Sequence, residues 1–143
     1  MTLAGTRTRV MRRYHYCSAR LPSLIYFRTG IGPEVFAYIS ADGNFTGNGN
    51  PPNNQLAFYE KHGYYIIAPD YIQRPEVLES NFYAWRVTGK DIYLQRARSA
   101  VASFNKYLKT PTGFGGIYDV NNPETPIIDE TESFWFAEVL KYL

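Results

Sequence analysis

Residues 71–89, YIQRPEVLESNFYAWRVTG, carry the signals for the start, the body and the end of a helix. Pro75 suits the first helical position, because the N–H that proline lacks would have no partner there. Apolar and polar side chains then alternate with a helical period as far as Thr88, and Gly89 suits the left-handed backbone of a C-cap. The stretch therefore predicts a helix from Pro75 to Thr88.

Two carboxylates lie on one face of this predicted helix. Glu76 and Glu79 fall in the same arc as Tyr83 and Arg86, while Val77, Leu78, Asn81 and Trp85 occupy another. Such a group of side chains could bind a cation or sugar hydroxyls, or hold a water molecule. Glutamates in a first helical turn also complement the helix macrodipole, so spacing alone leaves both interpretations open.

A second helix is predicted from Asp91 to Leu108, with an apolar stripe along it. The connection 88–90 is short, so the two helices should form an antiparallel hairpin. Residues 111–126 are typical of a loop, with a possible strand at Gly116–Val120. The predicted stripe consists of Tyr93, Ala97, Ala100, Val101, Phe104 and Leu108.

The first half of the chain gives weaker signals. Residues 5–20 are compatible with a helix that Pro22 would end. Residues 29–34 and the Gly- and Asn-rich residues 41–54 indicate loops, and Tyr64–Ala68 indicates a short strand. A helical hairpin and isolated helices joined by long loops do not make a closed core, which favours a fragment of a larger domain.

The last predicted helix opens at Asp129 and continues to Leu143. Residues 129–132, DETE, have the form of a capping box with Glu132 at the third helical position. Glu132 also aligns with the apolar residues Trp135, Phe136, Val139 and Leu143. An acid on a buried face needs a metal or a hydrogen-bond donor as partner, so a structural and a functional role are both open for Glu132.

Composition and charge exclude some classes of protein. The 143 residues form one domain at most, with 45% hydrophobic and 20% charged residues and a net charge of +2. That charge favours neither a nucleic-acid binder nor a membrane-surface protein, and no window approaches the ~18 apolar residues of a membrane span. A solvated helix face is preferred to a phosphate-binding patch for the basic cluster Arg7, Arg9, Arg12, Arg13 and Arg20.

Two residues bear on the cellular compartment. Asn44-Phe45-Thr46 is an N-glycosylation sequon within the loop 41–54, which weakly favours a lumenal or secreted location for Asn44. Cys17 is the single cysteine, so it is either a buried thiol or half of a bridge to another polypeptide segment. The N-terminus lacks the apolar run of a signal peptide, so a targeting segment would lie outside this chain.

Several motifs together resemble the signature of glycoside hydrolase family 47, the class I α-1,2-mannosidases. The resemblance starts with residues 71–80 and 85–89. Three further matches keep the family's order: residues 29–34 (TGIGPE), 110–113 (TPTG) and 132–142 (ESFWFAEVLKY). It runs from about Cys17 to Leu143, so residues 1–143 are predicted to be one partial catalytic domain of this family.

The resemblance implies an all-α fold that is the C-terminal part of an (α/α)7 barrel, an incomplete toroid with long loops and short β-hairpin strands. It implies a calcium-dependent enzyme that removes terminal α-1,2-linked mannose from N-glycan oligosaccharides with inversion. Its substrate partner would be a high-mannose N-glycan or glycoprotein. Its location would be the secretory pathway: endoplasmic reticulum, Golgi or outside the cell.

The resemblance also implies roles for single residues. Glu76 matches the general base, and Glu34 matches a further acidic member of the catalytic set. Arg74, Glu79 and Glu132 match residues that line the bottom of the pit and contact the terminal mannose. Glu79 and Glu132 would also meet the water shell of Ca²⁺.

Departures from the family pattern matter for activity. The family's principal acid, a catalytic Asp and the disulfide partner of Cys17 would lie upstream of this chain, and the calcium-ligating Thr would lie beyond Leu143. Gln73, Thr131 and Val139 replace the usual Leu, Met and Thr. The chain is therefore predicted to lack activity alone. The alternatives are a non-catalytic relic that binds high-mannose glycans and a structural fragment of a truncated gene.

Overall fold

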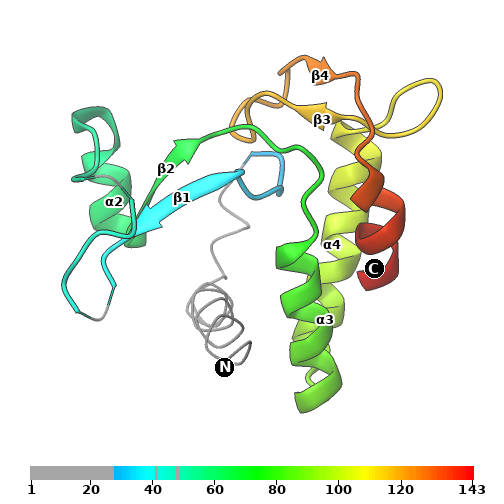
Figure 1. The fold of residues 1–143 in the computed structure, drawn as a ribbon, viewed down its shortest axis with the longest axis horizontal. Helices are drawn as coiled ribbons and strands as arrows, with labels where there is room; N and C mark the ends of the chain where they lie inside the picture. The colour runs from blue at the N-terminus through cyan, green and yellow to red at the C-terminus, as the bar shows by residue number, and fades with distance from the viewer. Residues whose placement is uncertain (1–27, 41, 48) are drawn as a thin grey trace, which may run out of the picture.

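The computed structural model describes residues 28–143 except 41 and 48, and Figure 1 shows two groups of elements. Helix α2 (Leu56–His62) and a two-stranded sheet lie on one side. Helices α3 (Glu76–Thr88) and α4 (Asp91–Tyr107) lie on the other, beside the C-terminal helical segment. The fold is mostly helical with a few short strands, as predicted. Cys17, the helix predicted at 5–20 and the N-terminal arginine cluster lie outside the described residues.

The α3–α4 hairpin agrees with the sequence prediction to within a residue at each end. Pro75 caps α3 instead of opening it, and its carbonyl accepts the Glu79 N–H at 2.8 Å. Gly89 ends α3 with φ of 65°, and its N–H donates to the Trp85 carbonyl at 2.7 Å. Glycine adopts this left-handed backbone without the clash that a Cβ atom causes, which is why the helix ends there.

The strands form two small antiparallel sheets. Strand β1 (Val35–Tyr38) pairs with β2 (Tyr64–Ala68), with an irregularity in register after Val35. Strand β3 (Gly116–Ile117) pairs with β4 (Ile127–Ile128). The prediction for β2 is confirmed with the same bounds. The predicted strand 116–120 is shorter in the structure, and β4 was not predicted.

The main core lies where α3, α4, β3 and the C-terminal segment meet. Phe104 of α4 and Leu108, which directly follows α4, are buried as the stripe predicts, whereas Val101 is 39% exposed. The other members of the stripe, Tyr93, Ala97 and Ala100, are half-buried, and Ala100 packs against the core. The buried core consists of Ile31, Tyr71, Leu78, Phe104, Leu108, Ile117, Val120, Trp135, Val139 and Tyr142.

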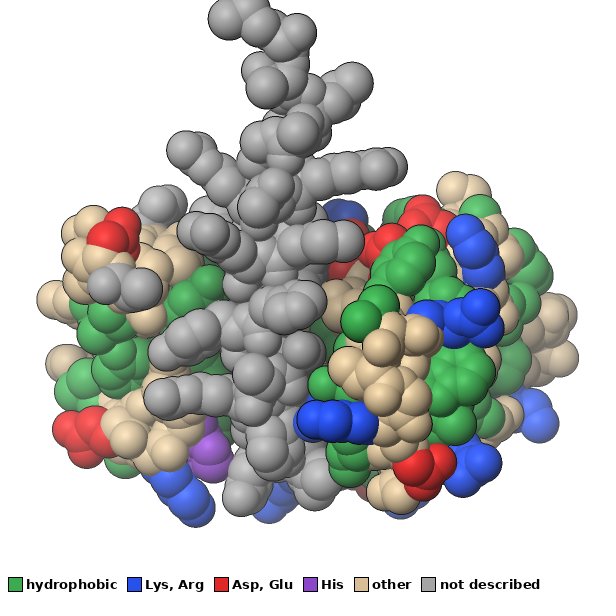
Figure 2. Space-filling model, turned by 90° about the horizontal axis from the view of Figure 1, so that it is seen from below, with side chains coloured by type: hydrophobic (Ala, Val, Ile, Leu, Met, Phe, Trp, Pro, Cys, Tyr) green, Lys and Arg blue, Asp and Glu red, His purple; other side chains and the backbone are tan. Residues whose placement is uncertain are grey.

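Aromatic side chains join α2 to the sheet of β1 and β2. Phe58 of α2 meets Tyr64 of β2 edge to face, with ring centroids 5.2 Å apart. Tyr65 of β2 meets Phe45 in the same way at 6.1 Å. Such edge-to-face pairs add to the burial of apolar surface, so this part of the chain packs largely through its aromatic residues. Figure 2 shows that hydrophobic side chains still reach the surface in both groups.

The start of the C-terminal helix was predicted wrongly. Helical structure begins at Ser133, not Asp129, and includes a π-helical stretch (Trp135–Val139) before α5 (Leu140–Tyr142). Residues preceding it are held by tertiary contacts: Ile127 and Ile128 pair with β3, and the Thr131 hydroxyl donates to the Phe114 carbonyl at 2.6 Å. These contacts prevail over the local capping signal.

Glu132 consequently lies before the helix instead of at its third position. Its carbonyl accepts the Trp135 N–H at 3.0 Å. The buried side of the segment consists of Trp135, Val139 and Tyr142, whereas Phe136 is 68% exposed. The predicted apolar face was therefore right for Trp135 and Val139 and wrong for Phe136 and for Leu143, which is 40% exposed. In the part of the chain that the structure describes, no helix is long and apolar enough to cross a membrane.

Candidate active site

Arg74 joins two carboxylates that are far apart in the sequence. It lies on the segment between β2 and α3, and its Nε atom forms an ion pair with Glu34 Oε1. Its Nη1 atom lies 3.9 Å from Glu76 Oε1 in the first turn of α3. We call these three residues the Arg74 cluster. The structure thus brings together three of the predicted site residues around a single guanidinium.

Glu34 is held in place by its own backbone and by both of its carboxylate oxygens. Its N–H donates to the Asp70 carbonyl at 2.7 Å. Its Oε2 accepts the Ile72 N–H at 3.4 Å, while Oε1 faces Arg74. The preceding loop is anchored by Thr29, whose hydroxyl donates to the buried Val120 carbonyl at 2.7 Å.

The two carboxylates of the Arg74 cluster differ in their solvent exposure. The Glu34 side chain is 11% exposed and the Glu76 side chain 33%. The contact of Glu76 with Arg74 is long, whereas Glu34 meets the same guanidinium closely. Glu76 is therefore the carboxylate of the cluster that is better placed to meet a water molecule or a substrate.

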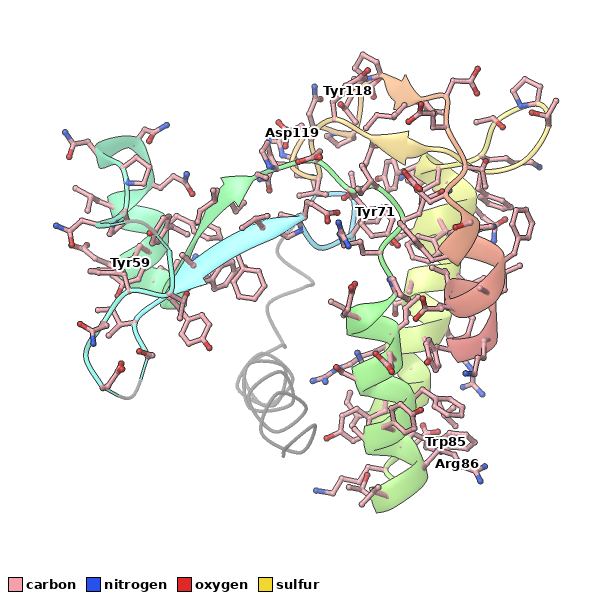
Figure 3. All side chains as sticks on the ribbon, in the orientation of Figure 1. Tyr59, Tyr71, Trp85, Arg86, Tyr118 and Asp119 are labelled. Carbon is pink, nitrogen blue, oxygen red and sulfur yellow. The ribbon has the colours of Figure 1, made fainter. Side chains whose placement is uncertain are left out.

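Tyr71 contacts the backbone of the Arg74 cluster and was not predicted as a site residue. Its ring stacks on Phe104 with centroids 5.8 Å apart, and its hydroxyl donates to the Arg74 carbonyl at 3.3 Å. Burial raises the pKa of Tyr71, and the negative charges of Glu34 and Glu76 raise it further. Figure 3 shows Tyr71 near the start of α3, whereas Trp85 and Arg86 lie at its other end.

The residues of the predicted arc are spread along the length of α3. The Arg86 guanidinium lies over the ring of its neighbour Trp85, with Cζ 5.8 Å from the ring centroid. Tyr83 is 46% exposed and its ring lies 6.1 Å from that of Tyr142. The helix-period interpretation grouped these residues with Glu76, but they are separated from it along the length of the helix.

Glu79 contacts the C-terminal helix instead of the Arg74 cluster. The Tyr142 hydroxyl donates to Glu79 Oε1 at 3.2 Å, and the Tyr142 ring packs against Phe82 at 5.6 Å. Desolvation by burial raises the pKa of Tyr142 to about 12, with the negative charge of Glu79 adding to the effect. Tyr142 was not singled out by the sequence, although its helical spacing from Trp135 and Val139 placed it on the buried side.

Glu132 is linked to the Arg74 segment through Gln73. The Glu132 N–H donates to Gln73 Oε1 at 2.9 Å, and Gln73 Nε2 donates to the Phe114 carbonyl at 2.9 Å. Gln73 is fully buried and has φ of 67°. A left-handed backbone costs a non-glycine residue about 1–2 kcal/mol, so the surrounding contacts must hold it there. Glu132 also lines a small pocket with Ile72, Gly116, Ile128 and Glu130.

The described residues do not by themselves form a calcium site. Among residues 28–143 outside positions 41 and 48, no group of three or more His, Cys, Asp or Glu side chains is arranged to hold a metal ion. Glu79 and Glu132, the predicted water-mediated ligands, contact different partners, Tyr142 and Gln73. Calcium requires about six to eight oxygen ligands, and these two glutamates do not supply them.

Asn44 lies in an exposed turn of the first group of elements. The Ser40 N–H donates to the Asn44 carbonyl at 2.8 Å, and the Thr46 N–H donates to the Tyr38 carbonyl at 2.9 Å. The Thr46 hydroxyl accepts the Tyr38 N–H at 3.0 Å. The turn is closed by its own hydrogen bonds, including those of Asn44 to the Asp42 carboxylate, and Asn44 is exposed to solvent.

Comparison with known proteins gives one consistent family. Residues 19–143 match glycosyl hydrolase family 47. The mannosyl-oligosaccharide alpha-1,2-mannosidase 1B of Aspergillus phoenicis is 46% identical over 115 residues, which are 80% of this chain and 21% of the relative. The protein of the same name from Emericella nidulans is 47% identical over 115 residues, with the same coverage.

A solved structure is also similar. The alpha-1,2-mannosidase from Trichoderma reesei superposes with a TM-score of 0.76 at 38% identity, over 88% of this chain and 26% of that chain. The chain thus spans about a fifth of the length of the curated relatives described above. The matched range agrees with the resemblance predicted from about residue 17 onward.

Proposed function

Because the chain belongs to glycosyl hydrolase family 47, we propose that it carries part of the active site of an inverting α-1,2-mannosidase that acts on N-glycan oligosaccharides. The observation that supports this most is the Arg74 cluster, in which Glu34 and Glu76 meet one guanidinium. The helical hairpin and the C-terminal helix would then belong to a ring of helix pairs, the (α/α)7 barrel.

Glu76 is the proposed general base. An inverting glycosidase needs one carboxylate to activate a water molecule and a separate acid to protonate the leaving oxygen. Glu76 suits the first task because its side chain is accessible and lies 3.9 Å from the positive charge of Arg74. Glu34 suits a supporting task, because both of its oxygens already have donors.

Arg74, Glu79 and Glu132 are proposed to contact the terminal mannose. Carboxylates and a guanidinium offer acceptors and donors that match the hydroxyls of a sugar. In this proposal the Tyr142 hydroxyl orients Glu79. Glu79 and Glu132 are also proposed to meet the water shell of a bound Ca²⁺ ion, because carboxylate oxygens and waters are the ligands that calcium prefers.

The 143-residue chain alone is proposed to lack turnover, because Glu34 is committed to Arg74 and Ile72 and no second acid joins Glu76 in the described cluster. The test is mannose release from α-1,2-linked mannobiose by the purified chain, with and without added Ca²⁺. No release is expected in either condition. Turnover by the chain alone would show that it holds a complete catalytic set.

A chimaera provides the complementary test. The matching 115-residue region of the Aspergillus phoenicis mannosidase is replaced by the corresponding residues of this chain, which are 46% identical. If these residues form a working part of the active site, the folded chimaera releases mannose. A chimaera with native circular dichroism and cooperative unfolding but no mannose release would contradict the proposed function.

The engagement of both Glu34 oxygens also favours a second candidate, glycan binding without hydrolysis. A site in which Glu34 is bonded to the Ile72 N–H and to Arg74 can still bind sugar hydroxyls through Arg74, Glu79 and Glu132. Binding of the chain to immobilised high-mannose glycans, with no mannose release by the chimaera, would support this candidate over catalysis.

A location in the secretory pathway is part of the proposal, with Asn44 as the glycosylated residue. Its exposed turn can accommodate a glycan. When the chain is expressed behind a signal peptide in a eukaryotic host, we expect a mobility shift on treatment with a peptide N-glycosidase. Asn44→Gln should abolish the shift, whereas Asn54→Gln, at an exposed asparagine outside any sequon, should retain it. A shift that survives Asn44→Gln would contradict the assignment.

A further inference from the structure

Gln73 has an unusual backbone for its residue type. Its φ is 67°, and it is the non-glycine residue with positive φ in the part of the chain that the structure describes. Its side chain is fully buried. Long side chains are uncommon at positive φ, and such a conformation persists only where the surrounding contacts determine it. The contacts of Gln73 must therefore account for its position.

Both the nitrogen and the oxygen of the buried Gln73 amide form hydrogen bonds. Nε2 donates to the Phe114 carbonyl and Oε1 accepts the Glu132 N–H, each at 2.9 Å. These bonds join segments 41 and 59 residues away in the sequence. Two residues earlier, Tyr71 exchanges N–H to carbonyl hydrogen bonds with Ile117 at 2.9 and 3.0 Å. The segment that leads into Arg74 is thus fixed against β3 and against the start of the C-terminal helix.

The two partners of the amide do not depend on it equally. The Phe114 carbonyl also accepts the Thr131 hydroxyl at 2.6 Å, so it keeps a donor if the amide is removed. Among the described residues, the acceptor of the Glu132 N–H is Gln73 Oε1. Glu132 is half-buried, and a donor shielded from water is destabilised when it loses its acceptor. Loss of the Gln73 amide should therefore act mainly on Glu132.

We infer that Gln73 is a positioning residue, whose buried amide sets the backbone of Glu132 relative to the adjacent Arg74 and the Glu76 that follows. What Glu132, Arg74 and Glu76 then bind rests on the proposed function. The placement of Glu132 by Gln73 rests only on the fold. An apolar side chain of the same length fills the same space but does not fix Glu132.

The first test compares two methionine variants of the 143-residue chain by hydrogen exchange of backbone amides. Gln73→Met keeps an unbranched chain of similar length and removes both hydrogen bonds. We expect protection at the Glu132 amide to fall about tenfold or more, with much smaller changes at Leu108 and Val120. Gln95→Met is the matched control, because Gln95 is exposed on α4 and its side chain donates to Asp91 in the same helix.

Two outcomes of this comparison would overturn the inference. One is unchanged protection of Glu132 in Gln73→Met. The other is an equal fall in protection at Glu132, Leu108 and Val120, which would show that Gln73 supports the whole scaffold instead of one contact.

A carboxyl variant gives a readout that depends on the hydrogen bond and not on the filled space. The side chain introduced by Gln73→Glu keeps an acceptor for the Glu132 N–H, and in its protonated form it can also donate to the Phe114 carbonyl. At acidic pH, where the carboxyl is protonated, protection of Glu132 in Gln73→Glu should therefore stay well above that in Gln73→Met. Equal loss of Glu132 protection in the two variants would contradict the assignment.

A sugar titration separates this inference from the proposed function. The same samples are titrated with α-1,2-linked mannobiose and followed by amide chemical shifts. If the wild-type chain binds, Gln73→Met should weaken binding about tenfold, since Glu132 is displaced; equal binding would overturn the positioning role. If the wild-type chain does not bind, glycan binding by this chain is contradicted, and the exchange data alone decide whether Gln73 positions Glu132.

Discussion

Arg74 and Tyr142 show how single residues connect distant parts of this chain. Arg74 pairs with Glu34, 40 residues earlier, and Tyr142 donates to Glu79, 63 residues earlier. Motif resemblance pointed to Glu34, Arg74, Glu76, Glu79 and Glu132, and the structure joins the first three directly. It could not point to Tyr71, Gln73 or Tyr142, because their contacts depend on tertiary packing that local spacing does not encode.

At the residue scale, Tyr142→Phe should reduce stability at neutral pH and have less effect at high pH. The substitution removes the hydrogen bond to Glu79 and should cost about 1 kcal/mol of unfolding free energy at pH 7. The folded pKa of Tyr142 is raised to about 12 from an ordinary value near 10. The stability that neutral Tyr142 contributes is thus present below pH 10 and is lost as the pH rises toward 12.

Urea unfolding of the wild-type chain and Tyr142→Phe between pH 7 and pH 12 measures this effect. The difference in unfolding free energy should shrink above pH 10. Tyr118→Phe is the control, because the Tyr118 side chain is exposed to solvent. A difference that stays constant with pH would show that Tyr142 contributes through packing of its ring alone.

At the scale of elements, those specified by local sequence signals were predicted correctly, and the one whose start depends on tertiary contacts was not. Helices α3 and α4 and strand β2 were predicted because periodicity and the Pro75 and Gly89 signals are local. The C-terminal helix was misplaced because Ile127 and Ile128 pair with β3, and Gln73 holds the Glu132 N–H. The π-helical stretch also changes the angular spacing on which the predicted apolar face depended.

Gly89→Ala tests the local account of the helical hairpin. Gly89 has φ of 65°, and the position that a Cβ atom would occupy is open, so the cost should come from the backbone alone. We expect a loss of about 1–2 kcal/mol in unfolding free energy by urea denaturation. Gly113→Ala is the matched control, since it also has open space but no positive φ. Equal stability of the two variants would contradict a left-handed C-cap at Gly89.

At the scale of the whole molecule, the described residues form two groups with unequal burial. The main core joins α3, α4, β3 and the C-terminal segment, and the Arg74 cluster lies where this core meets the segment that follows β2. The chain also exposes large apolar side chains, among them Val87 and Phe136. Family membership was predictable from ordered motifs, whereas the arrangement of the two groups was not, because no local pattern encodes it.

We propose that Glu76, which lies 3.9 Å from the Arg74 guanidinium, is the base of a mannosidase site. The direct measurement is kcat for mannose release by the chimaera with Glu76→Gln, beside Glu60→Gln on the exposed face of α2 as the control. General-base catalysis contributes roughly 10²–10⁴-fold, so kcat should fall by that order for Glu76→Gln and stay unchanged for Glu60→Gln. A Glu76→Gln chimaera that keeps kcat within a few-fold of its parent would contradict the claim.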